Sequence, residues 1–223
     1  MFPGFEALFL TVKLAALSTV ILLLIGTPVA WWLARSKSRF KPIIEAVVAL
    51  PIVLPPTVLG FYLLVLLSPG SSFGGWWFEL TGQTLTFSFS GLVIASVIYS
   101  FPFVVQPIQS AFETVGRDMM EAAYTLGAKP LDAFFTVAMP LARRGFLTGT
   151  VLGFAHTLGE FGVVLMVGGN IPGETRVVSI AIYDHVESLE YAQAHVLSGI
   201  LLGTAFIAIL MMYVVNARLR VKA

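Results

Sequence analysis

Long apolar stretches alternate with short polar connections along the whole chain. A helix needs roughly 20 apolar residues to cross a hydrocarbon core about 30 Å thick, and five stretches reach that length. They cover residues 8–33, 43–67, 90–111, 146–168 and 193–215. The pattern predicts an all-α integral membrane protein, built as a bundle of about five transmembrane helices.

Prolines interrupt two of the five stretches. Residues 43–67 contain Pro51, Pro55 and Pro56, so we expect this helix to be bent or locally unwound. Pro102 and Pro107 lie within residues 90–111, where we expect a kinked helix. Neighbouring helices in a membrane protein can satisfy the carbonyl groups that a proline leaves free. Both stretches therefore remain membrane spans.

The composition agrees with a membrane protein and excludes several kinds of site. Of the 223 residues, 57% are hydrophobic and 11% are charged, against roughly 25% charged in an ordinary soluble domain. No polar linker separates the stretches, so we expect one transmembrane domain over residues 1–223, with its core at about 8–215. The absence of cysteine excludes a thiolate metal site. A net charge of +1 without a basic block interleaved with aromatics predicts no nucleic-acid partner.

Basic residues are concentrated in every second connection, which predicts the orientation. Eleven of the 13 Lys and Arg residues lie in three regions, namely Arg35, Lys37, Arg39 and Lys41, then Arg117, Lys129, Arg143 and Arg144, then Arg218, Arg220 and Lys222. Cytoplasmic loops are enriched in Lys and Arg. We therefore expect a multi-pass protein of the cytoplasmic (inner) membrane with its N-terminus outside and its C-terminus in the cytoplasm. The first eight residues carry Glu6 and no basic residue, so we expect no cleavable signal peptide.

Five helices from one chain are few for a complete transport pathway. The two halves of the chain do not mirror each other in hydropathy, as an inverted-repeat transporter would. We therefore expect a homodimer, in which a second copy of the chain completes the path at the interface.

The connection at residues 113–144 is long and amphipathic. We expect a helix from Arg117 to Leu126, a stop at Gly127 in a positive-φ conformation, and a second helix that starts at Pro130 and ends at Pro140. Two short helices of this kind can dock into a groove of a cytoplasmic partner. The alternative is a hairpin in the membrane interface that only caps the bundle.

This connection also carries a motif, and with it a family resemblance. The chain reads Glu121-Ala122-Ala123-Tyr-Thr-Leu-Gly127, then nine residues, then Val137-Ala-Met139-Pro140. It resembles the EAA loop of bacterial ABC importer permeases, E-A-A, three residues, G, nine residues, I-x-L-P, with conservative changes at Val137 and Met139. The resemblance implies a type I importer fold with a cytoplasmic coupling helix that contacts an ATPase subunit. The residues that it assigns to this contact are Arg117, Glu121, Ala122, Ala123, Gly127 and Pro130.

Further motifs narrow the resemblance. The runs His156-Thr-Leu-Gly159-Glu160-Phe161-Gly162 and Gly169-Asn170-Ile-Pro-Gly-Glu-Thr-Arg176 resemble the G-E-F-G and G-N-I-P-G-x-T-R signatures of molybdate permeases, and Leu54-Pro55-Pro56-Thr57-Val58 with Gly60 resembles their second-helix motif. This implies a molybdate importer permease, with sulfate and tungstate permeases as the alternatives. It also implies two ATPase subunits, a periplasmic or extracellular molybdate-binding protein, and no cofactor. The chain has no G-x-x-x-x-G-K-[ST] phosphate loop, so ATP hydrolysis is expected on the separate subunit.

Three residues are candidates for the translocation path or its gate: Glu160, Asn170 and Arg176. A carboxylate inside a span is costly, so Glu160 should face protein or water. His156 lies four residues earlier, where a helix would bring the two side chains together. A structural polar tie is the alternative to a gate. A membrane-embedded enzyme with His156 and Glu160 as acid and base is a second alternative, and a scaffold that only anchors an ATPase is a third.

Two glycine stripes have the spacing that lets helices approach closely in lipid. They are Gly145, Gly149 and Gly153 in one span, and Gly199 and Gly203 in another. Packing within the chain and contact with a second copy are both compatible with this spacing.

Overall fold

A computed structural model describes residues 4–218, and this part of the chain is built from helices without strands. Arg220 and Lys222 of the C-terminal basic region lie outside the described residues. The elements are α1 (Phe5–Arg35), α2 (Lys41–Val53), α3 (Pro56–Leu67), α4 (Ser72–Thr81), α5 (Phe89–Val115), α6 (Asp118–Thr125), α7 (Pro130–Ala133), the π-helix η1 (Phe134–Ala138), α8 (Met139–Leu141), α9 (Arg143–Leu158), α10 (Gly162–Gly168), α11 (Val178–Glu187) and α12 (Tyr191–Arg218).

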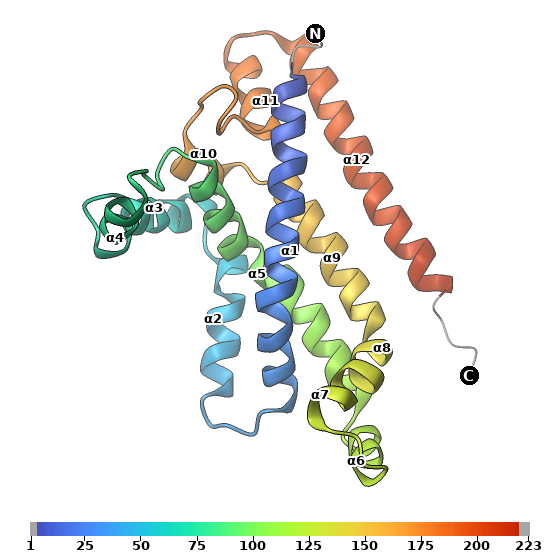
Figure 1. Ribbon diagram of the computed structural model, residues 1–223. Helices are drawn as coiled ribbons and strands as arrows, with labels where there is room; N and C mark the ends of the chain where they lie inside the picture. The colour runs from blue at the N-terminus through green and yellow to red at the C-terminus, as the bar shows by residue number, and fades with distance from the viewer. Residues whose placement is uncertain (1–3, 219–223) are drawn as a thin grey trace.

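The bundle is organised around α1, α5 and α9, which pack against one another (Figure 1). Leu14 and Leu22 of α1 and Val104 and Ile108 of α5 are buried in one apolar cluster. In contrast, α12 packs on α9 and α11 along one side and leaves most of its surface exposed, as its splayed position in Figure 1 shows. The apolar core thus lies at α5, and α12 lies at the periphery.

Three helices, α1, α5 and α12, are long and apolar enough to cross a membrane alone. Two pairs each pass the same test as one broken span: α2 with α3, bent by 111°, and α9 with α10, bent by 60°. The expectation of about five spans therefore agrees with the structure by length and composition. The bend predicted at Pro55 and Pro56 is confirmed, and α5 continues as one helix through Pro102 and Pro107.

The fourth span differs from expectation, because residues 146–168 do not form one helix. The helix α9 ends at Leu158, and α10 begins at Gly162. Gly159 is the C-cap residue of α9. Phe161, the residue before α10, has φ −128° and ψ −65°, outside the helical region. A glycine between two apolar helical segments costs little where a chain must turn, but its position alone does not reveal the break.

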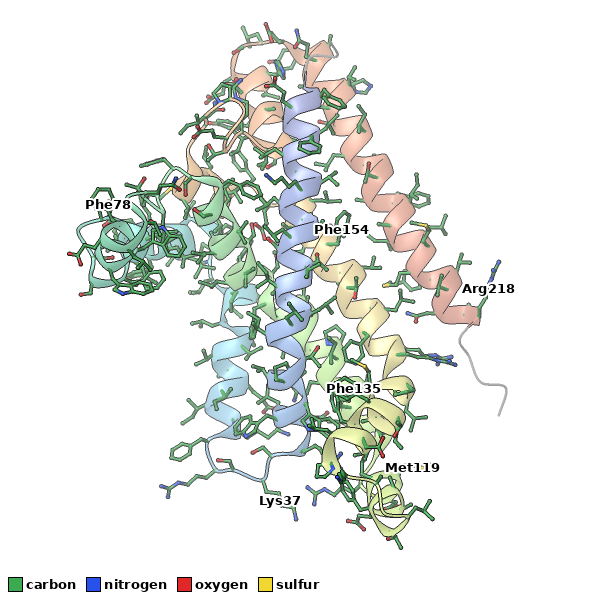
Figure 2. All side chains as sticks on the ribbon, viewed as in Figure 1. Lys37, Phe78, Met119, Phe135, Phe154 and Arg218 are labelled. Carbon is green, nitrogen blue, oxygen red and sulfur yellow. The ribbon has the colours of Figure 1, made fainter. Side chains whose placement is uncertain are left out.

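The connections that carry basic residues lie at one end of the molecule. The connection between α1 and α2 and the helices α6 and α7 are at the bottom of Figure 1, while the start of α1 and the helix α11 are at the top. Lys37 and Met119 mark the same end in Figure 2. The helices therefore alternate in direction as the charge pattern requires.

The glycine stripe of α9 packs within the chain. A methyl group added at Gly145 would lie 2.3 Å from Ala111 Cβ and 2.6 Å from the Pro107 carbonyl oxygen of α5. A methyl group added at Gly149 or at Gly153 would likewise lie close to Val104 of α5. The stripe of α12 differs, because a methyl group at Gly199 or Gly203 would meet nothing within 4 Å.

This contrast yields a matched pair of variants. Gly145→Ala should lower the free energy of unfolding by about 1–3 kcal/mol, because α5 and α9 would have to separate. Gly203→Ala adds the same methyl group to a helix without a close neighbour and should leave the purified chain in detergent unchanged. Thermal unfolding followed by fluorescence would compare them, and equal midpoints would contradict the packing described for α9.

Candidate functional site

The segment 117–130 forms a compact turn of helix at the basic end of the molecule. Met120 and Ala123 of α6 are buried in the main apolar cluster, so the helix is held against the bundle. The outer face of the turn is exposed and partly apolar: Met119 is 58% exposed, and Leu126 is 89% exposed. Glu121 and Ala122 lie on this exposed side. The geometry is that of a small knob with a free surface.

Gly127 ends α6 as predicted. Its φ is +90°, and its N–H donates to the Tyr124 carbonyl at 3.0 Å, while the Ala128 N–H donates to the Ala123 carbonyl at 3.0 Å. This is the hydrogen-bond pattern of a Schellman motif, which favours glycine because the left-handed conformation is strained for other residues. Pro130 opens α7, and Arg117 precedes α6. The predicted start and stop positions are confirmed.

The second helical segment runs from Pro130 to Leu141, so its predicted end at Pro140 is confirmed to within one residue. The chain continues from α7 through the π-helix η1 into α8, and Pro140 lies at the start of α8. A proline has no N–H to donate a hydrogen bond to the carbonyl oxygen four residues earlier, and its ring clashes with that carbonyl group. A π-helical turn at Phe134–Ala138, which the sequence pattern does not predict, widens the helix just before this proline. The segment is therefore a nearly continuous connection from α7 to α9.

Glu160 lies at the break between α9 and α10, in a buried polar cluster. Its side chain is 1% exposed. Ser96 Oγ and Ser100 Oγ of α5 donate to its two carboxylate oxygens, each at 2.6 Å. The hydroxyl of Ser179 in α11 donates to its main-chain carbonyl oxygen. The break is thus tied to α5 on one side and to α11 on the other.

His156 joins this cluster from the end of α9. Its Nδ1 lies 2.9 Å from Ser100 Oγ and 3.5 Å from Glu160 Oε1, and its ring stacks on Phe103 with centroids 3.9 Å apart. A hydrolytic triad places the serine and the carboxylate on different ring nitrogens. Here the same nitrogen faces both, and Ser100 is completely buried. The arrangement ties the end of α9 to α5 and does not have the geometry of a hydrolytic triad.

Asn170 and Arg176 lie together at the end of the molecule opposite α6. Their shared partner is Asp184 of α11, which the sequence pattern does not single out. Arg176 Nε donates to Asn170 Oδ1, Asn170 Nδ2 donates to Asp184 Oδ1 at 3.2 Å, and Arg176 Nη2 lies 3.5 Å from Asp184 Oδ2. The three side chains connect the loop after α10 to α11. Arg176 therefore carries a charge that is already paired.

A second polar cluster ties α2 to α5 near the basic end. Gln109 Nε2 donates to Glu45 Oε1 at 2.8 Å and to Glu113 Oε1 at 3.1 Å, and Lys41 Nζ lies 3.6 Å from both carboxylates. It borders a cavity of about 300 Å³ that Gln106 and Ser110 also line. Amide side chains inside an apolar stretch are the sequence signal that could have revealed this cluster.

Comparison with known proteins identifies the family. Residues 26–221 match the family described as binding-protein-dependent transport system inner membrane component. The molybdenum transport system permease protein ModB of Azotobacter vinelandii is 59% identical over 217 residues, which cover 97% of this chain and 95% of the relative. The chain belongs to this family of transport permeases. ModB of Escherichia coli is 39% identical over 83% of this chain and 81% of its own, and the sulfate permease CysT of Synechocystis is 32% identical over 92% and 71%.

Solved structures support the permease fold. A bacterial ABC transporter that imports the acidic polysaccharide alginate contains a chain with a TM-score of 0.78 and 15% identity, covering 99% of this permease and 81% of that chain. An amino acid ABC transporter with histidines gives a TM-score of 0.65 and 20% identity, covering 96% and 92%. At these identities the likeness establishes the fold alone.

The serine partners of Glu160 in this permease allow a double-mutant test. Ser100→Ala should lower the free energy of unfolding by about 1.5–3 kcal/mol, because it removes a hydroxyl bonded to a carboxylate. In a Glu160→Gln background the same change should cost less, since the acceptor is then a neutral amide. Unfolding of all four proteins in detergent measures the coupling.

Thr114→Ala serves as the control, because the Thr114 hydroxyl bonds only to the Ser110 carbonyl of its own helix. If Ser100→Ala costs the same in both backgrounds, the bond to Glu160 does not stabilise the break.

Proposed function

We propose that this chain is the permease subunit of an ATP-driven importer that moves molybdate across the cytoplasmic membrane. The observation that carries the proposal is the 59% identity to a molybdenum transport permease over nearly the whole chain. The sulfate permease is related at 32% identity, which favours molybdate over sulfate. Tungstate has the same shape and charge as molybdate and stays an alternative substrate.

The proposed assembly contains two copies of this chain, two ATPase subunits and an external molybdate-binding protein. A structural relative is a bacterial alginate ABC transporter in complex with a periplasmic protein that carries its substrate, with a TM-score of 0.76. Because basic connections favour the cytoplasmic side, we expect α6 on that side and the loop with Asn170 and Arg176 on the outer side. The ATPase thus meets one end of the chain, and the binding protein meets the other.

The coupling segment, residues 117–130, is positioned to pass motion to the bundle. It follows α5 directly after Gly116, and it leads through α7, η1 and α8 into α9 without an extended linker. Met120 and Ala123 share the apolar cluster with α1 and α5. A displacement of α6 therefore moves α5 and α9, the two helices that hold the Glu160 cluster.

In this mechanism, ATP binding closes the ATPase pair and draws the coupling segments together. The two bundles then rotate from an inward-open to an outward-open arrangement as rigid bodies. The energy comes from the difference in nucleotide affinity between the two states. The permease itself forms and breaks no covalent bond.

Transport in a reconstituted system tests the proposal. Vesicles with the permease, its ATPase and the binding protein should accumulate labelled molybdate when ATP is supplied on the ATPase side. Uptake should stop when any component is omitted, and excess sulfate should compete poorly. ATP hydrolysis without uptake would favour the scaffold alternative, and stronger competition by sulfate than by molybdate would contradict the substrate.

Changes in the coupling segment should separate ATP hydrolysis from uptake. Gly127→Pro is incompatible with φ +90° and removes the N–H that bonds Tyr124. Glu121→Arg reverses a charge on the exposed face of α6. We expect both variants to insert normally, and to lose tenfold or more of uptake while ATP hydrolysis persists.

Matched controls sharpen this test. Gly127→Asn introduces a residue that tolerates positive φ, so this variant should retain most of the uptake. Glu79→Arg makes the same charge reversal at an exposed residue of α4, away from the coupling segment and from the outer loop, and should leave coupling intact. Normal uptake in both Gly127→Pro and Glu121→Arg would remove the coupling role from this segment.

A further inference from the structure

An apolar groove of about 420 Å³ runs between α1 and the helical segment that follows the coupling segment. Leu24, Pro28 and Trp31 line it from α1, and Leu131, Phe134 and Phe135 line it from α7 and η1. Its walls are open: Leu24 is 70% exposed, Leu131 is 74% exposed, and Phe135 is 58% exposed. An open apolar groove of this size in a membrane protein suits a hydrocarbon chain.

Two aromatic rings that line the groove, Trp31 and Phe134, pack against each other and against a third ring, Phe112, behind them. The Trp31 ring meets Phe112 of α5 edge to face at a centroid distance of 4.9 Å, and Phe134 of η1 at 5.0 Å. Phe112 and Phe134 lie 5.8 Å apart. Since such pairs restrict ring orientation, the groove has a defined shape, unlike a surface covered only by aliphatic side chains.

Two basic residues adjoin residues that line the groove, and we refer to them as its rim. The Arg35 guanidinium stands 4.5 Å above the Trp31 ring, and Lys129 directly precedes Pro130, which also lines the groove. The ion pairs of the described residues 4–218 involve neither of these two side chains. A guanidinium whose contact is with a ring still has N–H groups available for a phosphate.

We propose that this groove binds an anionic phospholipid, with one acyl chain against Trp31 and Phe134 and the phosphate at Arg35 and Lys129. The acyl chains of a zwitterionic lipid would fit the apolar groove equally well. Its headgroup would bind Arg35 and Lys129 more weakly, because it carries no net negative charge. The proposal concerns the membrane partner of the chain and does not depend on which oxyanion is transported.

The location gives such a lipid a structural effect. One wall of the groove is α7 and η1, which join the coupling segment to α9. A bound acyl chain fills the space between this wall and α1, and so supports the position from which α6 projects.

Lipid titration of the full-length chain tests the rim. Delipidated protein in detergent is titrated with phosphatidylglycerol or with phosphatidylcholine of the same acyl chains, and bound lipid is counted by native mass spectrometry. One phosphatidylglycerol should bind more tightly than phosphatidylcholine. Arg35→Gln and, separately, Lys129→Gln should each weaken phosphatidylglycerol binding about fivefold, and Lys37→Gln, which removes a charge from the same connection as Arg35, should not.

A second pair of variants tests the apolar part. Leu24→Trp fills the groove from α1 and should abolish the tight site for phosphatidylglycerol. Val12→Trp adds the same side chain to another exposed position of α1 and should leave the site intact. Equal binding of the two lipids, an equal loss in the Arg35 and Lys37 variants, or unchanged binding in Leu24→Trp would each overturn the proposal.

Discussion

A polar group inside a hydrocarbon layer has to find its partner within the protein, and this constraint gives α5 its place at the centre of the structure. Lipid offers no hydrogen bonds, so every buried carboxylate and every break in a helix needs support from a neighbour. Ser96 and Ser100 of α5 provide it for Glu160, and Gln109 of the same helix provides it for Glu45 of α2. The helix α5 therefore contacts α2 through Gln109 and the break after α9 through Ser96 and Ser100, at two different levels along its length.

The same constraint explains why the two helix breaks meet. The break after α2 places Pro56 at the start of α3, and the break after α9 places Gly162 at the start of α10. A methyl group at Gly162 would lie 2.8 Å from Pro56 Cβ, so the close approach of the two helix starts requires a residue without a side chain. Two interruptions that pack against each other expose less free backbone than two interruptions apart. The bent spans consequently behave as one structural unit joined to α5.

The parts of this structure that depend on neighbouring residues in the sequence were predictable, and the parts that depend on distant pairs were not. Gly127 and Pro130 are local signals, and both take the predicted roles in the turn. Pro140 is a local signal too and lies one residue before the end of its segment. The π-turn at Phe134–Ala138 was not predictable, because Phe134 packs on Trp31 of α1 and Phe112 of α5, which are distant in the sequence. The partners of Glu160 lie 60 and 64 residues away. Only the fold could show that two serines of α5 face the break in the fourth span.

The charged candidates for the path are satisfied within the chain, and this bears on how an oxyanion could pass. Glu160 is buried, and both of its carboxylate oxygens accept hydrogen bonds from serine hydroxyls of α5. Arg176 is paired with Asp184 and held by Asn170, which reduces its attraction for a second anion. Conduction requires a site that binds weakly enough to release the ion. On the proposed function, we expect hydroxyl groups and backbone dipoles to contact the substrate in place of these charges, and the external binding protein to carry most of the selection among oxyanions.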